Sequence, residues 1–578
     1  MAEMLQGFAG TSDDQEFYLL SPPGYKIGTT KYVVVLGSVI SGVGKGIFSA
    51  SLGKVLQDKG LAVSPLKFDG YLNVDAGTLN PYRHGEVFVL DDGTECDMDL
   101  GNYERFLQKN LSRENYLTSG KIFTMVLDKE RRGGYLGKDV QFVPHVTGEI
   151  IGFLRELAVK QRADVVLVEV GGTVGDVENS YFIEAMRELA YAEGEGNVCF
   201  VNVTYIMEPP STGEQKSKAA QLGVKRLQGQ GIQPHVVVCR CPTPLEQKVR
   251  EKVSVHSNVP LARVIGLEDK RSIYEVPAHL RKSGIDQEIL RILHLTGKDD
   301  SVPAKQWEGF VSRVLQPKHE IVVGITGKYT KVKDSYASIL HALEHAGASL
   351  DAHVSVKWIE TTEIEQGASP DDVLAGVHGI IVPGGFGKRG TEGKIACVRH
   401  ARERRVPYLG LCFGFQMAVA EFARNVCGLQ GANSTELGET PHPVIDLLPE
   451  QHGLAKVGGS MRLGGREVKL RAGSLVQKLY GSSTVRERFR HRYEVNPAYI
   501  DALTQKGLLF SGEAEGIMKL LELPGHPFFV GTQAHPEFRS RPLEPHPLFV
   551  GFVAACQKTD KSGRAAGRDE VRAVQAGD

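Results

Sequence analysis

Apolar runs rich in β-branched residues punctuate the first half of the chain, and they constrain its fold more than any other feature. The first run reads YVVVLG at positions 32–37, and similar runs cover 164–170, 198–206 and 235–240. Uninterrupted runs of this kind are typical of strands buried on both faces of a parallel sheet. Helical stretches separate them, so the sequence predicts an α/β domain with a doubly wound parallel sheet.

The chain has 578 residues, too many for one hydrophobic core, which indicates at least two large domains. Apolar runs at 320–325, 379–383 and 408–411 predict a second α/β domain. The predicted divisions are a mobile N-terminal extension (1–30), a first α/β domain (31–297), a polar, irregular linker (298–318), a second α/β domain (319–556) and a disordered tail (557–578).

Composition excludes several classes of protein. The formal net charge is −1 and the pI is near 7.0, so no global basic field draws the chain to nucleic acid. The eight cysteines lack paired Cys-x-x-Cys spacing, which indicates a reducing compartment and argues against a zinc site. Asp13, Asp14 and Glu16 precede any apolar run, and no window of eighteen residues is continuously apolar, so we expect neither a signal peptide nor a membrane span. We therefore expect a soluble cytoplasmic enzyme.

The first strand leads into a glycine-rich turn that reads GSVISGVGKGI at positions 37–47. A glycine-rich turn that enters a helix directs backbone N–H groups at an anion, and a lysine within it reaches the outer phosphates of a nucleotide. The turn departs from a Walker A motif, because Val39 replaces the first glycine and Gly46 replaces the Ser or Thr that holds magnesium. The turn predicts a phosphate site centred on Lys45, with the metal held elsewhere; an ordinary strand-to-helix turn is the alternative.

Two segments supply carboxylates of the kind that Mg²⁺ prefers, at 95–101 (ECDMDLG) and 168–178 (VEVGGTVGDVE). Glu169 lies within an otherwise apolar strand, where an unpaired charge is costly, so we expect a cation or a lysine beside it. A structural salt bridge is the alternative interpretation of this residue.

In the second half, an apolar strand runs into GLCFG at positions 410–414, and QAHPEF follows at 533–538. Gly-x-Cys-x-Gly after a strand is typical of a nucleophile elbow, where glycines let the chain turn sharply into a helix. The thiolate is the reactive form of cysteine, and a helix N-terminus and a nearby imidazole favour it. The predicted catalytic residues are Cys412, His535 as its base and Glu537 as the orienting carboxylate. A buried structural cysteine beside a His-Pro-Glu turn is the alternative.

The elbow and the distal His-x-Glu are similar to those of the class I glutamine amidotransferases. Together with the phosphate turn, KFDGYLNVD at 67–75, and the Asp99 and Glu169–Glu178 segments, they resemble the CTP synthase family over residues 31–555. The resemblance implies an N-terminal P-loop-like synthetase domain and a C-terminal class I glutamine amidotransferase domain. It also implies that ATP phosphorylates O4 of UTP and that ammonia from glutamine displaces this phosphate, giving CTP, ADP, phosphate and glutamate.

The resemblance assigns roles to individual residues. ATP would contact Gly42, Val43, Gly44, Lys45, Gly46, Ile47, Lys67, Asp99 and Arg240, and Mg²⁺ would be held by Asp99 and Glu169. UTP or CTP would contact Ser41, Asp176, Val177, Glu178, Lys216, Ser217, Lys218, Ala219, Ala220, Gln221 and Lys252. Glutamine would contact Gly385, Phe413, Gly414, Phe415, Gln416, Glu436 and Arg492, with Gly385 and the amide after Cys412 as the oxyanion hole. The family further implies GTP as an allosteric activator, CTP as an inhibitor and a homotetramer.

The chain departs from the family pattern at several positions. Gly70 and Ala76 replace prolines, and Lys388 stands before Arg389 where an aromatic is frequent, in the 387–393 lid that relates to GTP activation. The nucleotide loop has Ser217, Ala219 and Ala220 in place of Thr, Pro and Thr, and Phe413 and Phe415 replace Leu and Met beside the nucleophile. These departures leave the strength of CTP and GTP regulation open.

Two other functions share parts of this pattern. A cobyrinate-type glutamine-dependent amidoligase also joins a phosphate-binding synthetase to a C-terminal glutaminase, but the segments at 172–178 and 216–221 favour a pyrimidine nucleotide. An ATP-switched scaffold of the partitioning-ATPase kind shares the unusual phosphate turn, but it has no use for Cys412, His535 and Glu537.

Overall fold

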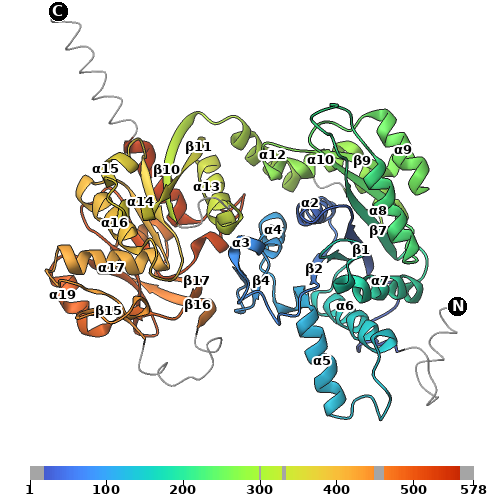
Figure 1. The fold of residues 1–578 in the computed structure, drawn as a ribbon, viewed down its shortest axis with the longest axis horizontal. Coiled ribbons are helices and arrows are strands. Elements are labelled where there is room, and N and C mark those ends of the chain that lie inside the picture. The colour runs from blue at the N-terminus through green and yellow to red at the C-terminus, as the bar shows by residue number, and fades with distance from the viewer. Residues whose placement is uncertain (1–17, 299–300, 328–332, 448–460, 560–578) are drawn as a thin grey trace, which may run out of the picture. The chain divides into compact units, whose positions relative to one another are not determined.

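The computed structural model describes residues 18–298, 301–327, 333–447 and 461–559 (Figure 1). The chain forms two compact units, one from Met1–Thr78 with Asp99–Val311 and the other from Leu79–Met98 with Ser312–Asp578. Of the predicted mobile extension and disordered tail, residues 1–17 and 560–578 lie outside the described residues.

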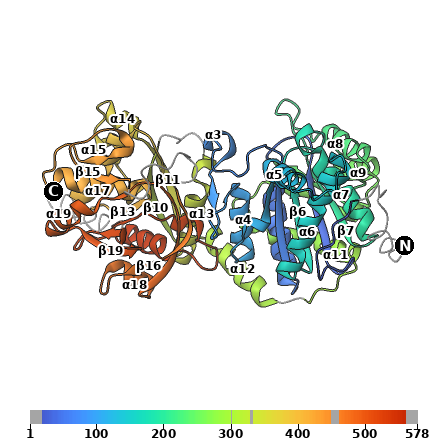
Figure 2. The same ribbon diagram turned by 90° about the horizontal axis from the view of Figure 1, so that it is seen from below.

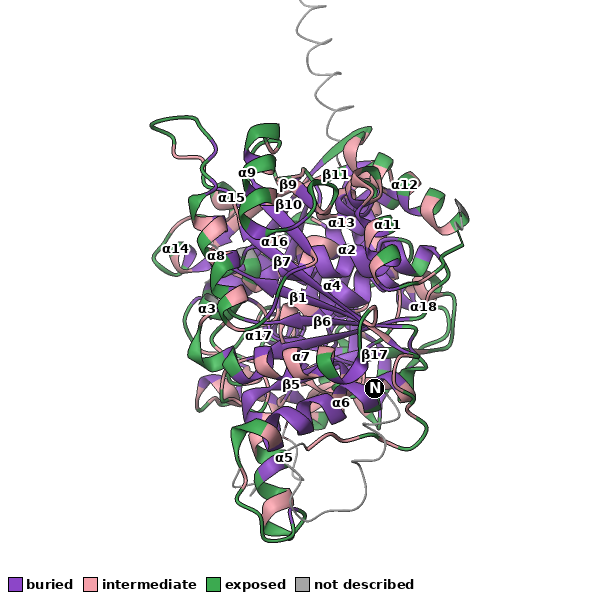
Figure 3. Cartoon of the chain, turned by 90° about the vertical axis from the view of Figure 1, so that its right-hand side faces the viewer, coloured by how far each residue is buried: buried purple, intermediate pink, exposed green. Residues whose placement is uncertain are grey.

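The first unit is built on a seven-stranded sheet in the order β5-β2-β6-β1-β7-β8-β9. Every neighbouring pair runs parallel. The strands are β1 (Lys31–Gly37), β2 (Val63–Asp69), β5 (Tyr116–Thr118), β6 (Val165–Val170), β7 (Val198–Tyr205), β8 (Val236–Cys241) and β9 (Val264–Glu268). The prediction of a parallel sheet from continuous apolar runs is confirmed, and β1 and β6 are buried along almost their whole length (Figure 3).

Helices cover both faces of this sheet (Figure 2). Side chains alternate between the faces of a strand. Val166 and Val168 pack in one core cluster with Leu154 of α6 and Phe182 of α7, whereas a β-carbon at Gly53 of α2 would meet Leu167 at 3.5 Å. The helices are α2 (Lys45–Asp58), α4 (Met98–Leu107), α5 (Ser119–Arg131), α6 (Thr147–Gln161), α7 (Ser180–Glu193), α8 (Lys218–Gly229), α9 (Gln247–Ser257), α10 (Val276–Ser283) and α11 (Ile285–Ile292). Across the described ranges, no helix is long and apolar enough to span a bilayer.

The second unit contains a nine-stranded sheet in the order β11-β10-β12-β13-β21-β20-β19-β16-β17. Strands β10 to β13 and β21 pair in parallel, and β20, β19, β16 and β17 continue antiparallel. The strands are β10 (His319–Gly327), β11 (Ala352–Glu360), β12 (Gly379–Val382), β13 (Tyr408–Leu411), β16 (Arg462–Leu470), β17 (Thr484–His491), β19 (Leu509–Ala514), β20 (Ile517–Glu522) and β21 (Phe529–Thr532). A small second sheet joins β14 (Asn433–Ser434), β15 (Pro443–Asp446) and β18 (Glu494–Val495).

The helices of the second unit are α13 (Ala337–Ser349), α14 (Thr361–Glu365), α15 (Pro370–Val373), α16 (Thr391–Arg404), α17 (Phe413–Asn425), α18 (Leu475–Tyr480) and α19 (Ile500–Gln505), with a further helix over 547–559. One core cluster joins Phe413, Phe415 and Met417 of α17 to Ile380 and Tyr408 of the sheet. The predicted second α/β domain is therefore present.

The segment predicted as an irregular linker contains helix α12 (Ser301–Leu315). Trp307 and Phe310 stand three positions apart, a helical spacing that puts them on one face of α12. Their side chains are 2% and 1% exposed. The indole N–H of Trp307 donates to the carbonyl of Tyr274 at 2.9 Å. Packing of these two large aromatic side chains thus stabilises the helix. The prolines and polar residues of the segment did not indicate a helix in the sequence.

The second half of the predicted mobile extension packs on the first unit. The hydroxyl of Tyr18 donates to Glu149 at 2.8 Å, and the guanidinium of Arg155 donates to the carbonyl of Leu20 at 3.0 Å. Arg155 is also paired with Glu193, and both side chains are buried. The aperiodic sequence of 18–30 gave no sign of these contacts, because they are made by single side chains and backbone carbonyls.

Residues 79–98 belong to the second unit, although they lie within the predicted first domain. They contain α3 (Pro81–His84) and the hairpin of β3 (Phe88–Val89) and β4 (Glu95–Cys96). Glu95 pairs with Arg490 of β17 at 2.7 Å, and Phe88 lies against Phe538 with ring centroids 4.9 Å apart. The hairpin therefore packs beside β17, the strand after which the predicted glutamine-binding residue Arg492 follows.

Candidate functional site

Cys412 occupies the turn between β13 and α17. Its φ and ψ are 49° and −96°, a conformation that a side chain disfavours and that is common at strained functional positions. The residue is the N-cap of α17 and is 7% exposed. The sulfur thus lies at the N-terminal, positive end of the α17 dipole.

The glycines on either side of Cys412 are required by close packing. A β-carbon at Gly414 would lie 2.0 Å from the carbonyl oxygen of Val382, and one at Gly410 would lie 2.5 Å from the hydroxyl of Tyr408. That hydroxyl donates to the carbonyl of Gly414 at 2.8 Å. The elbow sequence is therefore explained by the approach of α17 to β12 and β13.

His535 and Glu537 follow β21 and form the predicted pair. Nδ1 of His535 lies 2.7 Å from Oε1 of Glu537, and the imidazole stacks on Phe538 with centroids 5.0 Å apart. A β-carbon at Gly384 would lie 2.9 Å from Cε1 of His535 and 3.7 Å from Cβ of Cys412, so both side chains border the same loop. Burial alone would lower the pKa of His535, but Glu537 and the Cys412 thiolate attract its proton and raise the pKa to about 10.

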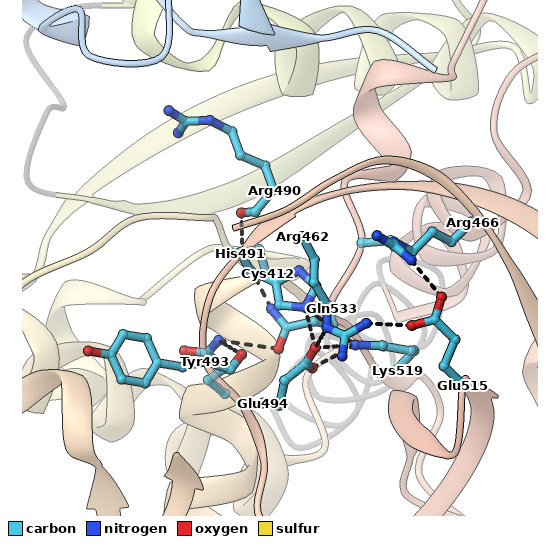
Figure 4. A network of polar contacts seen from close by, with 12 residues as sticks. Cys412, Arg462, Arg466, Arg490, His491, Tyr493, Glu494, Glu515, Lys519 and Gln533 are labelled. Atoms are coloured by element: carbon cyan, nitrogen blue, oxygen red, sulfur yellow. Dashed lines mark hydrogen bonds and ion pairs between the residues drawn. The ribbon is translucent and has the colours of Figure 1, made fainter. Parts of the chain in front are cut away.

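Two further groups contact the sulfur of Cys412 (Figure 4). The thiol lies 3.6 Å from the carbonyl oxygen of Arg490, and Nε2 of Gln533 lies 3.5 Å from the sulfur. Neither residue was assigned a role from the sequence. Gln533 stands two residues before His535 in the same motif, but the sequence does not reveal where its amide points.

Four of the residues predicted to bind glutamine, Phe413, Gly414, Phe415 and Gln416, lie on α17 directly after the nucleophile. Gln416 donates from Nε2 to the carbonyl of Tyr493 at 3.1 Å, and its Oε1 is buried without a hydrogen-bond partner among the described residues. Glu436 accepts from the backbone N–H of Gly387 at 3.3 Å. Phe413, Gly414 and Phe415 form the buried first turn of α17, and Arg492 directly follows β17.

Gly385 and the amide of Phe413 were predicted to form the oxyanion hole. Lys394, to which the sequence assigned no role, is 5% exposed and lies beside both residues. Its Nζ would lie 3.4 Å from a β-carbon at Gly385 and lies 5.0 Å from the ring centroid of Phe413. A buried ammonium at this place adds positive potential beside the two residues predicted for the oxyanion hole.

A buried ionic network lies next to this site (Figure 4). Both carboxylate oxygens of Glu494 accept from Lys519 at 2.6 Å, and Oε1 also lies 2.9 Å from Nε2 of His491 and 2.8 Å from Nε of Arg462. Burial raises the pKa of Glu494, but His491 and Lys519 outweigh it and the pKa falls to about 2. Burial lowers the pKa of Lys519 to about 8 and that of His491 to about 4. The network holds the strand that carries Arg490 and precedes Arg492.

In the first unit, the glycine-rich turn enters α2 as predicted. Gly42 and Gly44 have φ of 71° and 90°, and Val39 also has a positive φ of 79°, so the residue that replaces the first glycine keeps a glycine-like backbone. Lys45 is buried and donates from Nζ to the carbonyl of Gly172 at 2.8 Å. Burial lowers the pKa of Lys45, and Glu169 partly opposes this effect.

The predicted metal ligands converge on Lys67. Its Nζ lies 2.5 Å from Oδ2 of Asp99 and 3.0 Å from Oε1 of Glu169. The second oxygen of Glu169 accepts from Tyr103 at 2.8 Å. Burial raises the pKa of Glu169, whereas Lys67 outweighs burial at Asp99 and lowers its pKa. Two carboxylates that already share one cation fit a hard ion such as Mg²⁺, which takes one or two protein carboxylates plus phosphate oxygens.

Another carboxylate of the 95–101 segment, Glu95, lies in the second unit and pairs with Arg490. Asp69 instead lies beside Lys67, at 3.8 Å, and it had no assigned role. Its Oδ2 accepts from the hydroxyls of Tyr71 and Tyr116 at 3.2 Å each. Within the described residues, no group of three His, Cys, Asp or Glu side chains is arranged to hold a metal.

Arg240 lies next to the phosphate turn, because a β-carbon at Gly44 would meet its Nε at 3.4 Å. Its guanidinium donates to the carbonyl of Leu267 at 3.1 Å and to Asp269 at 2.6 Å. Of the other turn residues predicted to contact nucleotides, Ser41 and Gly42 are exposed, Val43 and Gly46 are buried and Ile47 is intermediate.

The residues predicted for UTP or CTP fall into two groups. Asp176, Val177 and Glu178 precede α7; Val177 is 82% exposed, and Val177 and Glu178 line a cavity of about 650 Å³ with Leu72, Phe142 and Tyr181. Asp176 accepts from the backbone N–H of Thr173 at 2.8 Å.

The second group lies at the start of α8 and on α9. Lys216 pairs with Glu214 at 2.5 Å, and Gln221 donates to the hydroxyl of Ser217 at 3.0 Å. The hydrogen bond from Lys216 lowers the pKa of Glu214, and Lys252 adds to this effect. Lys218 and Lys252 are exposed and Ala219 is intermediate, whereas Ala220 is 0% exposed and packs in the core.

Comparison with known families matches both halves of the chain. The family model described as CTP synthase N-terminus covers residues 31–295, and the model described as Glutamine amidotransferase class-I covers residues 331–555. A solved glutaminase domain of Trypanosoma brucei CTPS with bound acivicin is 36% identical, covers 41% of this chain and 94% of that domain, and has a TM-score of 0.39.

Similar curated proteins extend over nearly the full chain. The CTP synthase of Thermococcus gammatolerans is 49% identical over 538 residues, which cover 92% of this chain and 100% of that protein. The CTP synthase of Methanopyrus kandleri is 50% identical over 529 residues, which cover 91% of this chain and 98% of that protein. A cobyrinate-type amidoligase is not favoured by these similarities. The chain, with its synthetase and glutaminase halves in the same order, belongs to the CTP synthase family.

Proposed function

We propose that the two described sites divide the glutamine- and ATP-dependent conversion of UTP to CTP that membership of this family implies. Cys412, His535 and Glu537 in the second unit would release ammonia from glutamine. Lys45, Lys67, Asp99 and Glu169 in the first unit would support phosphorylation of UTP by ATP. The observation that carries this division is that the described residues of each unit include a cluster of reactive groups, and that the chemistry of the two clusters differs.

In the glutaminase half, the thiolate of Cys412 attacks the carboxamide carbon of glutamine, and the C–N bond breaks after His535 gives its proton to the leaving ammonia. Water then attacks the resulting thioester, His535 takes a proton from it, and glutamate leaves with regeneration of the thiolate. The 2.7 Å contact with Glu537 keeps Nδ1 of His535 protonated and turns Nε2 toward the reacting atoms. Gly385 and the amide of Phe413 would stabilise the oxyanion, with Lys394 beside them.

Gln416, Glu436 and Arg492 would hold the amino and carboxylate ends of glutamine. A planar guanidinium suits a carboxylate. The buried Oε1 of Gln416, which has no hydrogen-bond partner among the described residues, is an acceptor suited to the substrate's ammonium group.

In the synthetase half, O4 of UTP attacks the γ-phosphorus of ATP, and the bond from that phosphorus to the bridging oxygen of ADP breaks. Ammonia then adds to C4 of the pyrimidine, loses a proton, and inorganic phosphate leaves with the former O4. Lys45 and Lys67 offset negative charge on the transferred group. When bound at Asp99 and Glu169, Mg²⁺ would supply further charge neutralisation and orient the phosphates.

We also propose CTP as an inhibitor and UTP as the substrate at residues 176–178, 216–221 and 252, with Ser41 at their phosphates. The cavity of about 650 Å³ beside Val177 and Glu178 supports binding near this segment. GTP would activate the glutaminase through the 387–393 lid, where Lys388 reaches Gly438.

We further propose that the chain assembles into a homotetramer and acts in the cytoplasm. The exposed apolar side chains of Leu72, Phe142 and Val177, at 72%, 59% and 82%, support an association surface on the first unit. All eight cysteines are free, which suits a reducing compartment.

The test is to incubate the protein with ATP, Mg²⁺ and UTP labelled with ¹⁸O at O4, and to supply either glutamine or ammonium. We expect CTP from both nitrogen sources, and inorganic phosphate that carries the label from UTP. Absence of CTP with both sources would overturn the function. Formation of CTP with unlabelled phosphate would overturn the phosphorylated intermediate alone.

A further inference from the structure

Gln533 connects the candidate nucleophile to the glutamine-binding side chain Gln416. It follows β21 and is 0% exposed. Its Nε2 lies 3.5 Å from the sulfur of Cys412 (Figure 4), and its Oε1 accepts from Nε2 of Gln416 at 3.2 Å. The backbone N–H of Gln533 donates to the carbonyl of Lys519 at 2.8 Å, which fixes the main chain from which the side chain extends.

The orientation of the Gln533 amide follows from its neighbours. Nε2 of Gln416 also donates to the backbone carbonyl of Tyr493 at 3.1 Å, and a carbonyl only accepts, so this end of Gln416 must be the NH₂ group. Gln533 must therefore present its oxygen to Gln416 and its NH₂ group to the sulfur. The reversed amide would place two NH₂ groups together and turn an oxygen toward a thiolate.

The two contacts of the sulfur respond differently to ionisation. A protonated thiol donates to the carbonyl of Arg490, at 3.6 Å. Once the proton is lost, this carbonyl faces a negative sulfur and the contact becomes unfavourable. The N–H of Gln533 gains strength at the same time, because a hydrogen bond to a charged acceptor is stronger than one to a neutral acceptor.

Nε2 of His535 is buried and makes no hydrogen bond with the described residues, whereas Gln533 places an N–H donor 3.5 Å from the sulfur. We propose that Gln533 is a positioning residue of the glutaminase site: its carboxamide stabilises and directs the Cys412 thiolate and links it to the Gln416 side chain. This inference rests on the proposed roles of Cys412 and Gln416.

The test compares Gln533→Leu and Gln533→Glu with the wild type in the full-length chain. Leucine removes both hydrogen bonds at similar volume, and glutamate keeps the acceptor for Gln416 but replaces the donor to sulfur with an oxygen. Gln505→Ala, an exposed position on α19, is the matched control. The first readout is the rate at which iodoacetamide alkylates Cys412 as a function of pH, followed on the Cys412 peptide by mass spectrometry. The second readout is CTP synthesis with glutamine and with ammonium.

Loss of one hydrogen bond to a charged group is expected to move the midpoint of the alkylation profile up by about one pH unit in Gln533→Leu. The shift should be larger in Gln533→Glu, because a buried carboxylate beside the sulfur disfavours the thiolate further. Leucine should in addition raise KM for glutamine, because Gln416 loses its acceptor, whereas glutamate should mainly lower kcat. Ammonia-dependent synthesis should stay within about twofold of the wild type, which shows that the chain has folded.

An unchanged alkylation midpoint in both variants would overturn the inference, even if turnover fell, because a packing role lowers turnover without moving the midpoint. If the leucine variant fails to fold, the glutamate variant decides alone. Cys412→Ala separates this inference from the function on which it rests. If Cys412→Ala keeps glutamine-dependent synthesis, the proposed nucleophile is wrong. If Cys412→Ala loses glutamine-dependent synthesis while the alkylation midpoints of the Gln533 variants stay unshifted, only the role of Gln533 is wrong.

Discussion

Gly46 and Asp99 lie so close that a β-carbon at residue 46 would stand 2.1 Å from Oδ1 of Asp99. In a Walker A motif this position carries the hydroxyl that holds magnesium. Here a carboxylate from the start of α4 fills the same volume, and it is also bound by Lys67. The glycine and the carboxylate are thus two parts of one arrangement, which explains why the phosphate turn departs from the usual pattern.

Gly46→Ala should lower CTP synthesis with either nitrogen source by roughly 100-fold, because the methyl group displaces Asp99 from Lys67 and from the proposed metal site. Steady-state synthesis with ammonium, measured over a range of Mg²⁺ concentrations, should show a higher requirement for Mg²⁺. Gly229→Ala is the matched control, since no atom lies within 4 Å of a β-carbon at the end of α8. Equal activity in the two variants would contradict this account.

Lys45→Ala should stop synthesis with glutamine and with ammonium, with a loss of roughly 100-fold or more, because the transferred phosphoryl group loses its nearest buried cation. Product formation and ATP hydrolysis should fall together. The exposed Lys282, on α10, supplies a control for the overall charge: Lys282→Ala should retain ATP hydrolysis. Full activity of the Lys45 variant with ammonium would place the phosphate site elsewhere.

Much of the sheet could be predicted, because β1, β6, β7 and β8 are continuous apolar runs. Strand β2 could not, since its sequence VSPLKFD contains Pro65 and Lys67, yet Lys67 emerges from it to meet Asp99. Helix α12 and residues 18–30 were also missed, because each is fixed by a few side chains that pack on parts of the chain far away in sequence.

The candidate site likewise contains groups that the sequence predicts and groups that only the structure reveals. The nucleophile elbow is a local pattern, and the packing around Gly410 and Gly414 accounts for it. The contacts of Gln533 and Lys394 depend on strands and helices that only the folded chain brings together. Sequence motifs therefore identified the groups that would react, whereas the groups that surround them required the structure.

Cys412→Ala should abolish glutamine-dependent CTP synthesis and leave ammonia-dependent synthesis near the wild-type rate, because only the first reaction uses the thiolate. Parallel assays with glutamine and with ammonium test this. Cys427→Ala is the control, since that cysteine is only partly buried and its sulfur contacts the carbonyl of Ala502. Loss of both activities in the Cys412 variant would show that the two halves do not act as separate catalysts.

Glu537→Gln should lower glutaminase kcat by roughly 100-fold, because a neutral amide does not stabilise the protonated imidazole that the reaction requires.

The Glu537→Gln change also affects the stability of the fold. The pKa of His535 is raised from 6.5 to about 10 in the folded chain, so the pair stabilises the fold fully below pH 6.5 and loses this contribution as pH rises through 10. The difference in Tm between wild type and variant should therefore be largest below pH 6.5 and should shrink toward pH 10. A difference that grew with pH would contradict the assignment of His535 as protonated.

Glu494→Gln should destabilise the second unit, because it leaves the buried ammonium of Lys519 without its carboxylate. Breaking such a pair from one side costs about 3 kcal/mol, and Lys519 and His491 both face the altered group. The pKa of Glu494 is lowered from 4.5 to about 2, so its stabilising contribution is present above pH 4.5 and is lost as pH falls toward 2. Urea unfolding at pH 7 and at pH 3.5 should show a large difference from the wild type at the first pH and a smaller one at the second. Glu467→Gln, at an exposed position of β16, is the control and should unfold like the wild type at both. If the Glu494 variant matched this control at pH 7, the network would contribute nothing to the stability of the strand that carries Arg490.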